Sequence, residues 1–144
     1  MSTTAQEFFD IDLWLAAIGH FVILLASFQV PYQLRWKEDL KQLMPLNRKL
    51  LWVQSSFTVL TIIAFGILSI VLHKDMLRGD RAALALVAFI GVYWTARILV
   101  DLVYFSHSDW PRGRHFVIGH VLLLALFCFL AASYIAVFAW KVRG

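Results

Sequence analysis

Four long runs of apolar residues dominate the sequence, and short connections that hold most of the charged residues separate them. The runs cover about 12–34, 50–72, 82–105 and 116–140. A helix needs about 20 mainly apolar residues to cross a bilayer, and each run reaches that length. Backbone inside a bilayer must be helical or form a closed barrel, and these runs are too long for barrel strands. The pattern therefore predicts four transmembrane helices.

The connections between the runs are short, so we expect consecutive helices to be antiparallel neighbours. No stretch outside the runs is long enough to form a soluble domain. The predicted fold is an all-α four-helix transmembrane bundle with up-down-up-down topology. Residues 1–144 would form a single domain.

The first connection, about 35–44, has an apolar pattern of its own. Among its charged residues, four apolar residues recur at helical spacing: Trp36, Leu40, Leu43 and Met44. A short amphipathic helix of this kind lies flat in the membrane interface. We expect one or two such turns here, and a frayed extension of the first span is the alternative.

Composition supports the membrane assignment. Hydrophobic residues make up 61% of the chain and charged residues 15%, whereas soluble domains hold about 45–50% and about 25%. A soluble chain of this length could not bury that much apolar surface. Composition therefore excludes a soluble domain, a disordered chain and a nucleic-acid-binding protein, despite a net charge of +4. The expected partners are the lipid bilayer and, because small bundles often assemble further, a homo-oligomer or a larger membrane complex.

The positions of lysine and arginine predict the orientation, because these residues collect in cytoplasmic loops. The first 34 residues contain neither, which favours a retained helix over a cleaved signal peptide. The first and third connections hold Arg35, Lys37, Lys41, Arg48, Lys49, Arg112 and Arg114. The opposite side holds Lys74, Arg78, Arg81, Lys141 and Arg143. We predict an integral protein of the plasma (inner) membrane with both termini outside the cytoplasm.

Two charged residues interrupt the third run. Arg97 and Asp101 are four residues apart, so they share a helix face and can pair, with Tyr93 on the same face. Ionisable residues at membrane depth are costly, which makes them candidates for function. The pair could lock the bundle, or Arg97 could extend to the interface. The functional alternative is a cavity where Arg97 binds an anionic group or Asp101 carries a proton.

A polar stripe of Gln54, Thr58 and Thr61 in the second run is expected to form hydrogen bonds across helices. With a rise of about 1.5 Å per residue, Gln54, Asp101 and His120 lie at similar depths near the cytoplasmic side. We therefore expect the second, third and fourth spans to contribute to one polar cluster in the inner leaflet.

Histidines inside the runs raise the question of a cofactor. His20 is expected to face the bundle interior as a hydrogen-bonded core residue. His20 and His120, on different helices, could hold a b-type haem. Their expected offset along the membrane normal is about 10 Å, which suits a proton relay or an elongated ligand such as a quinone better than one shared iron.

Side chains that suit a divalent metal are concentrated around the third connection: His107, Asp109, His115 and His120. These residues match no named motif. His115 and His120 are about 140° apart around a regular helix, so both cannot bind one ion from it. We prefer the interpretation that His107 and His115 lie at the lipid headgroups, and keep metal as the alternative.

Several other residues receive structural interpretations. We expect His73 to lie in a solvated loop and Cys128, the single cysteine, to pack inside the bundle. Four glycines are expected to let helices approach closely: Gly19, Gly66, Gly91 and Gly119.

Two classes of function stay open, because the sequence contains no G-x-S-x-G, H-E-x-x-H or P-loop motif. We prefer a non-enzymatic accessory, binding or transport-related membrane module whose polar cluster holds a ligand or partner. The alternative is a membrane oxidoreductase or other enzyme that uses haem, a metal or a quinone. The candidate residues are Arg97, Asp101, His120, His20, Gln54 and Tyr93.

The predicted orientation can be tested with a reporter fused to the C-terminus. A reporter active only in the cytoplasm should be inactive there, because positively charged loops stay inside and leave both termini outside. A reporter active only outside the cytoplasm serves as the matched control. Activity of the cytoplasmic reporter would reverse the orientation.

Overall fold

The computed structural model of the chain describes residues 3–106, 108 and 112–144. Its four long helices are α1 (Thr3–Gln33), α3 (Pro45–Val71), α5 (Arg81–Val103) and α6 (Arg114–Arg143). The shorter elements are α2 (Trp36–Asp39), the 3-10 helix η1 (Leu40–Gln42) and α4 (His73–Arg78). Each long helix is long and apolar enough to cross a membrane. The all-α four-helix prediction is confirmed, and the chain is an integral membrane protein.

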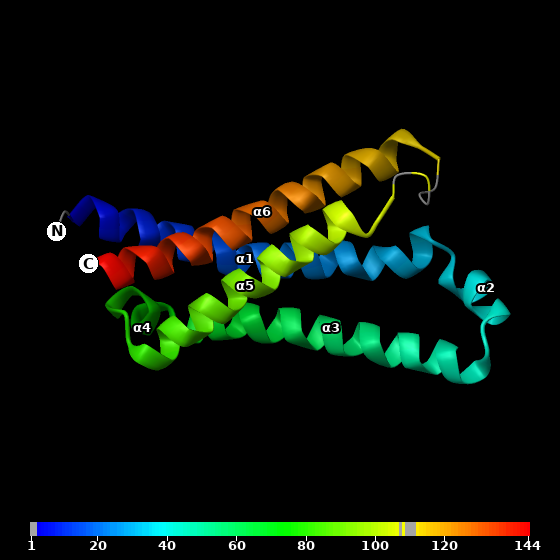
Figure 1. Cartoon of the computed structure of the whole chain (residues 1–144), viewed down its shortest axis with the longest axis horizontal. Coiled ribbons are helices and arrows are strands. Elements are labelled where there is room, and N and C mark those ends of the chain that lie inside the picture. Colours follow the sequence, from blue (N-terminus) through cyan, green and yellow to red (C-terminus); the bar gives the residue numbers. More distant parts are fainter. Residues whose placement is uncertain (1–2, 107, 109–111) are drawn as a thin grey trace.

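The long helices run alternately up and down the bundle (Figure 1). Both termini and α4 lie at one end, which we call the terminal end. The short helix α2 and the start of α6 lie at the opposite end, which we call the distal end. The predicted topology is therefore confirmed.

Helix α1 begins nine residues before the predicted span. Residues 3–11 contain no proline or glycine that would stop a helix. With 31 residues, α1 is about 46 Å long, whereas the hydrocarbon core of a bilayer is about 30 Å thick. This extension carries Asp10 and Asp12 into contact with other helices, as described below. The other three helices begin and end within five residues of their predicted bounds.

The closest helix pairs are α1 with α3 and α5 with α6, and contacts between α1 and α6 join the two pairs. Helices α3 and α5 meet through aromatic rings. The ring centroid of Phe65 lies 5.9 Å from that of Phe89 and 5.0 Å from that of Tyr93. We expected consecutive long helices to be close neighbours, and among the three consecutive pairs α3 and α5 are the least close. The short helix α4 packs at the junction of these two helices.

The hydrophobic core lies in the terminal half of the bundle. Its buried members include Leu13, Ile23, Phe65, Val87, Ile90, Trp94, Phe127, Leu130 and Val137. Toward the distal end α3 and α6 diverge (Figure 1), and many large apolar side chains are exposed, among them Leu50, Phe57, Val103, Val117 and Leu122. Cys128 is also exposed, so its predicted interior position is wrong. It lies on the outer face of α6, next to the buried Phe127.

Glycines allow close helix contacts in the core. A Cβ atom at Gly66 would lie 3.0 Å from ring atoms of Phe21, where α1 meets α3. A Cβ at Gly91 would lie 3.1 Å from an α6 side chain, and one at Gly19 would lie 3.2 Å from another. The predicted close approach is confirmed at these three positions. It is wrong at Gly119, where a Cβ would meet nothing within 4 Å.

The first connection forms short helical turns, as its pattern predicted. Arg35 has a left-handed φ of 50°, which turns the chain from α1 into α2. Leu40 is buried, and the ring of Trp36 lies 5.5 Å from the ring of Trp52 on α3. These contacts hold the turns against the distal end of the bundle. Their position in the membrane interface stays a prediction.

Candidate functional site

His20 lies at the centre of the bundle and has no exposed surface. Its Nδ1 atom is 2.9 Å from the carbonyl oxygen of Ala16, and Trp94 donates its Nε1–H to Nε2 of His20 at 3.0 Å. A carbonyl oxygen only accepts hydrogen bonds and an indole N–H only donates, so His20 is the neutral tautomer protonated on Nδ1. The prediction of an inward, hydrogen-bonded histidine is confirmed.

Aromatic rings from the other three long helices surround His20. The ring centroids of Trp94 on α5, Tyr134 on α6 and Phe65 on α3 lie 5.5, 5.7 and 6.0 Å away. His20 therefore touches every long helix. Since both of its ring nitrogens have partners, a bond from His20 to a haem iron would cost one of these buried hydrogen bonds.

Two more hydrogen bonds join helices toward the terminal end. The hydroxyl groups of Ser69 on α3 and Tyr134 on α6 are 2.6 Å apart. Ser133 on α6 donates to Oδ1 of Asp12 on α1 at 3.0 Å. Side-chain hydrogen bonds of this kind hold helices together in lipid. These residues therefore contribute to the scaffold that positions the site.

His73 contradicts its predicted place in a solvated loop. It belongs to α4 and is 5% exposed. Its Nε2 atom lies 2.5 Å from Oδ1 of Asp10, and its ring centroid lies 4.5 Å from that of Trp14. The second connection folds into a helix that packs against the extension of α1, which the charged sequence around His73 does not indicate.

Asp101 and His120 form an ionisable pair between α5 and α6 in the distal half. His120 Nε2 lies 3.0 Å from Asp101 Oδ2, and the two side chains are 22% and 8% exposed. The contact has the distance of an ion pair, which forms when His120 is protonated. It does not meet the geometry of a hydrogen bond, because Asp101 Oδ2 is a buried atom with no hydrogen-bond partner among the described residues. Within the described part of the chain, Arg97 forms no ion pair with Asp101, so that predicted pairing is wrong. Helix α6 instead places His120 against the carboxylate of Asp101, which lies on the same helix as Arg97.

Arg97 lies one turn before Asp101 on α5 and packs on an aromatic face. Its guanidinium carbon is 5.5 Å from the centroid of the Phe127 ring, a cation–π geometry. Phe127 in turn stacks on Trp94, with 5.1 Å between ring centroids. Tyr93 is half-buried and packs on Trp94 from another side, with 5.2 Å between centroids. Arg97 therefore lies between the aromatic core and the Asp101–His120 pair.

The two intramembrane histidines lie at different depths. Phe127 is level with Trp94, the partner of His20, because their rings stack. His120 precedes Phe127 by seven residues on the same helix, which corresponds to about 10 Å along the helix axis. The distance agrees with the offset that the sequence predicted.

Gln54 does not join the pair of Asp101 and His120. It is exposed on α3, whose distal half diverges from α6 (Figure 1). Thr58 donates to the carbonyl oxygen of Gln54 at 3.0 Å, and Thr61 donates to that of Phe57 at 2.9 Å. The predicted hydrogen bonds across helices are therefore wrong, because these hydroxyls are satisfied within their own helix.

The metal hypothesis has two of its four residues, His107 and Asp109, outside the described residues. His115 is exposed at the start of α6, with its ring centroid 4.4 Å from that of Phe116. Within residues 3–106, 108 and 112–144, no three His, Cys, Asp or Glu side chains gather closely enough to hold a metal ion.

Sequence reasoning missed most partners of the buried polar residues. Trp94 carried a signal, because it is the one tryptophan far from the ends of the predicted spans. Asp10, Asp12 and Ser69 carried none, since each bonds to a residue at least 63 positions away. Pairings at that separation depend on how the helices rotate and cross.

Comparisons of the sequence and the fold with protein-family models, with curated proteins and with solved structures find no match.

Replacing Trp94 with phenylalanine should destabilise the protein. The substitution keeps an aromatic ring but removes the N–H that bonds to His20, and an unsatisfied buried polar group costs about 1–3 kcal/mol. We expect a lower thermal unfolding midpoint in detergent for Trp94→Phe and little change for Trp52→Phe, whose side chain is exposed. If the hydrogen bond is the cause, Trp94→Phe should cost less in a His20→Leu background. An equal cost in both backgrounds would contradict this.

A double-mutant cycle tests the pair between α5 and α6. Asp101→Asn and His120→Gln should show a coupling energy of about 0.5–3 kcal/mol in thermal or denaturant unfolding, because the two side chains are in contact. The matched cycle of Asp101→Asn with Arg97→Gln should show a smaller coupling. A larger coupling between Arg97 and Asp101 would restore the pairing that the sequence suggested.

Proposed function

We propose that this protein is a small non-enzymatic membrane module, of an accessory, binding or transport-related kind, that binds an anionic ligand together with a proton. The observation that carries the proposal is the 3.0 Å contact between His120 and Asp101 across two helices, beside the cation of Arg97. Ionisable groups at membrane depth mark ligand and proton sites by default. We call Arg97, Asp101 and His120 the ionisable cluster.

The charges of the ionisable cluster suggest how proton and ligand would be coupled. With His120 neutral, the charges of Arg97 and Asp101 cancel. Protonation of His120 leaves a single positive charge in a poorly solvated layer, where electrostatic attraction is strong. A proton would therefore favour anion binding, and a bound anion would favour protonation to the same extent.

The position of Arg97 supports this role. Its guanidinium group packs on Phe127 and forms no ion pair among the described residues, so its donors can serve a carboxylate or phosphate of a ligand. His120 is 22% exposed and lies in the half of the bundle where the helices diverge. An anion could thus reach the cluster without disrupting the core around His20.

The oxidoreductase alternative depends on haem, a metal or a quinone near the histidines. His20 has both ring nitrogens in hydrogen bonds, and its layer is about 10 Å from that of His120. A haem joining the two histidines would need one of these bonds to break and the helices to shift. These observations favour the binding module.

We also propose that the protein lies in the plasma membrane with both termini outside, on the basis of its basic connections. The ionisable cluster would then face the cytoplasmic half of the bilayer. The exposed apolar faces of the distal half offer surface for a homo-oligomer or a larger membrane complex, which cross-linking in native membranes would detect.

The proposal can be tested on purified protein in detergent by titration with acetate, benzoate and inorganic phosphate. At least one anion should bind, bind more tightly at lower pH, and bring about proton uptake. Arg97→Gln should weaken binding at least tenfold, and Arg97→Lys should weaken it less. Arg78→Gln, a change at an exposed arginine of the terminal end, is the matched control and should bind like the wild type.

Three outcomes would contradict the proposal. The first is that none of the three anions binds, and the second is that Arg97→Gln binds as tightly as Arg78→Gln. The third is an absorbance spectrum with a Soret band, or a metal analysis with stoichiometric Fe, Cu or Zn. That third result would favour the oxidoreductase.

A further inference from the structure

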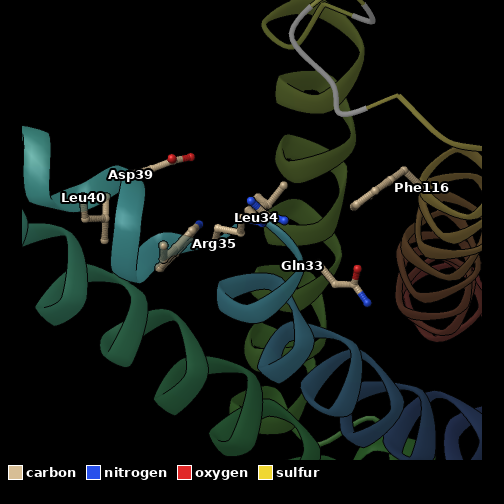
Figure 2. Close-up of a pocket in the computed structure, with 7 residues that line it drawn as sticks. Gln33, Leu34, Arg35, Asp39, Leu40 and Phe116 are labelled. Carbon is tan, nitrogen blue, oxygen red and sulfur yellow. The ribbon is translucent and has the colours of Figure 1, made fainter.

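A pocket of about 630 Å³ lies at the distal end, apart from the ionisable cluster. It is formed by the end of α1, by α2 and by the first turn of α6, and Figure 2 shows Phe116 pointing from α6 toward the end of α1. Its polar lining is Gln33, Arg35 and Asp39, and its aromatic lining is Trp36 and Phe116. Pockets of about 300–1,000 Å³ accommodate small ligands or headgroups.

The lining contains one positive side chain, Arg35, and one negative side chain, Asp39, and the two form no ion pair with each other. Among the described residues, the carboxylate nearest to Arg35 is that of Glu38 at 3.9 Å, and both side chains are more than 70% exposed. An exposed pair of that geometry contributes little energy, so the guanidinium can turn to another anion. Within the described residues, Asp39 is in no ion pair. The pocket therefore complements a ligand that carries both charges.

The residues in and around the pocket are of the kinds that membrane proteins place at lipid headgroups. Trp36 of its wall packs on Trp52 with 5.5 Å between ring centroids, and tryptophan rings prefer the headgroup zone. Beside the pocket, Tyr32 and Val117 expose 84% and 53% of their surfaces on the faces of α1 and α6. An amphiphile could thus place a polar head in the pocket and its chains along these helices.

We infer that this pocket binds the headgroup of a zwitterionic phospholipid. Arg35 and the Gln33 amide bind the phosphate, because a guanidinium presents paired N–H donors to phosphate oxygens. Asp39 binds the ammonium group, and the rings of Trp36 and Phe116 pack against the headgroup. The left-handed backbone of Arg35, with φ of 50°, holds its side chain at the bend between α1 and α2.

The inference is tested by native mass spectrometry of detergent-purified protein. The protein is mixed with equal amounts of phosphatidylethanolamine and phosphatidylglycerol that have identical acyl chains. The wild type should retain at least fivefold more phosphatidylethanolamine. The double variant Arg35→Gln with Asp39→Asn should lose that preference while circular dichroism shows unchanged helicity.

The matched control is Lys37→Gln with Glu38→Gln, which removes the same two charges from the same segment but outside the pocket lining. It should keep the preference of the wild type. Phe116→Leu, which keeps both charges, should retain less of either lipid because it removes a ring from the wall.

The inference is overturned by equal retention of the two lipids or by a preference for phosphatidylglycerol. It is overturned as well if the control variant loses the preference as fully as the Arg35 and Asp39 variant. If soluble phosphoethanolamine at equal concentration displaces phosphatidylethanolamine, the occupant is a soluble phosphate ester and the lipid assignment is wrong.

Discussion

A neutral histidine at the centre of the bundle touches all four long helices, and Ala16 and Trp94 occupy its two ring nitrogens. In a bilayer, an apolar helix face gains little by exchanging lipid for a neighbouring helix, because lipid tails are just as apolar. Helix association therefore depends on close packing and on polar groups that find partners. His20 meets both conditions, since the missing side chain of Gly66 lets α3 approach it. The other interhelical hydrogen bonds of the terminal half extend the same arrangement.

The result is a bundle whose two halves differ. The terminal half is closely packed, and α4 closes it by bonding His73 to Asp10. In the distal half α3 diverges from α6 (Figure 1), and many large apolar side chains of the described residues are exposed there. The stack of Trp94, Phe127 and Arg97 connects the halves, so the packed core fixes the position of the cation in the ionisable cluster. The binding role that we propose for the cluster would therefore have a rigid support.

Hydropathy predicted the helices because insertion depends on the length and polarity of each segment by itself. The inward position of His20 was also predictable, because a lone polar residue in lipid must face protein. The partner of Asp101 was not, because Arg97 shares its helix face and is the nearer residue in sequence. The packing of α6 on α5 instead brings His120 to the carboxylate. The sequence placed Gln54 in the same layer as Asp101 and His120 from its depth alone. Depth does not indicate how far α3 diverges from α6.

The sequence by itself determined the medium, the four spans and the few residues that do not suit lipid. Each of these follows from local composition and a rise of about 1.5 Å per residue. Only the tertiary structure decided which of those residues meet: His20 with Trp94, Asp101 with His120, and His73 with Asp10. The reason is geometric. The depth of a residue follows from its position along its own helix. Its partners depend on how the helices rotate, cross and diverge, and the packing between distant segments sets that arrangement.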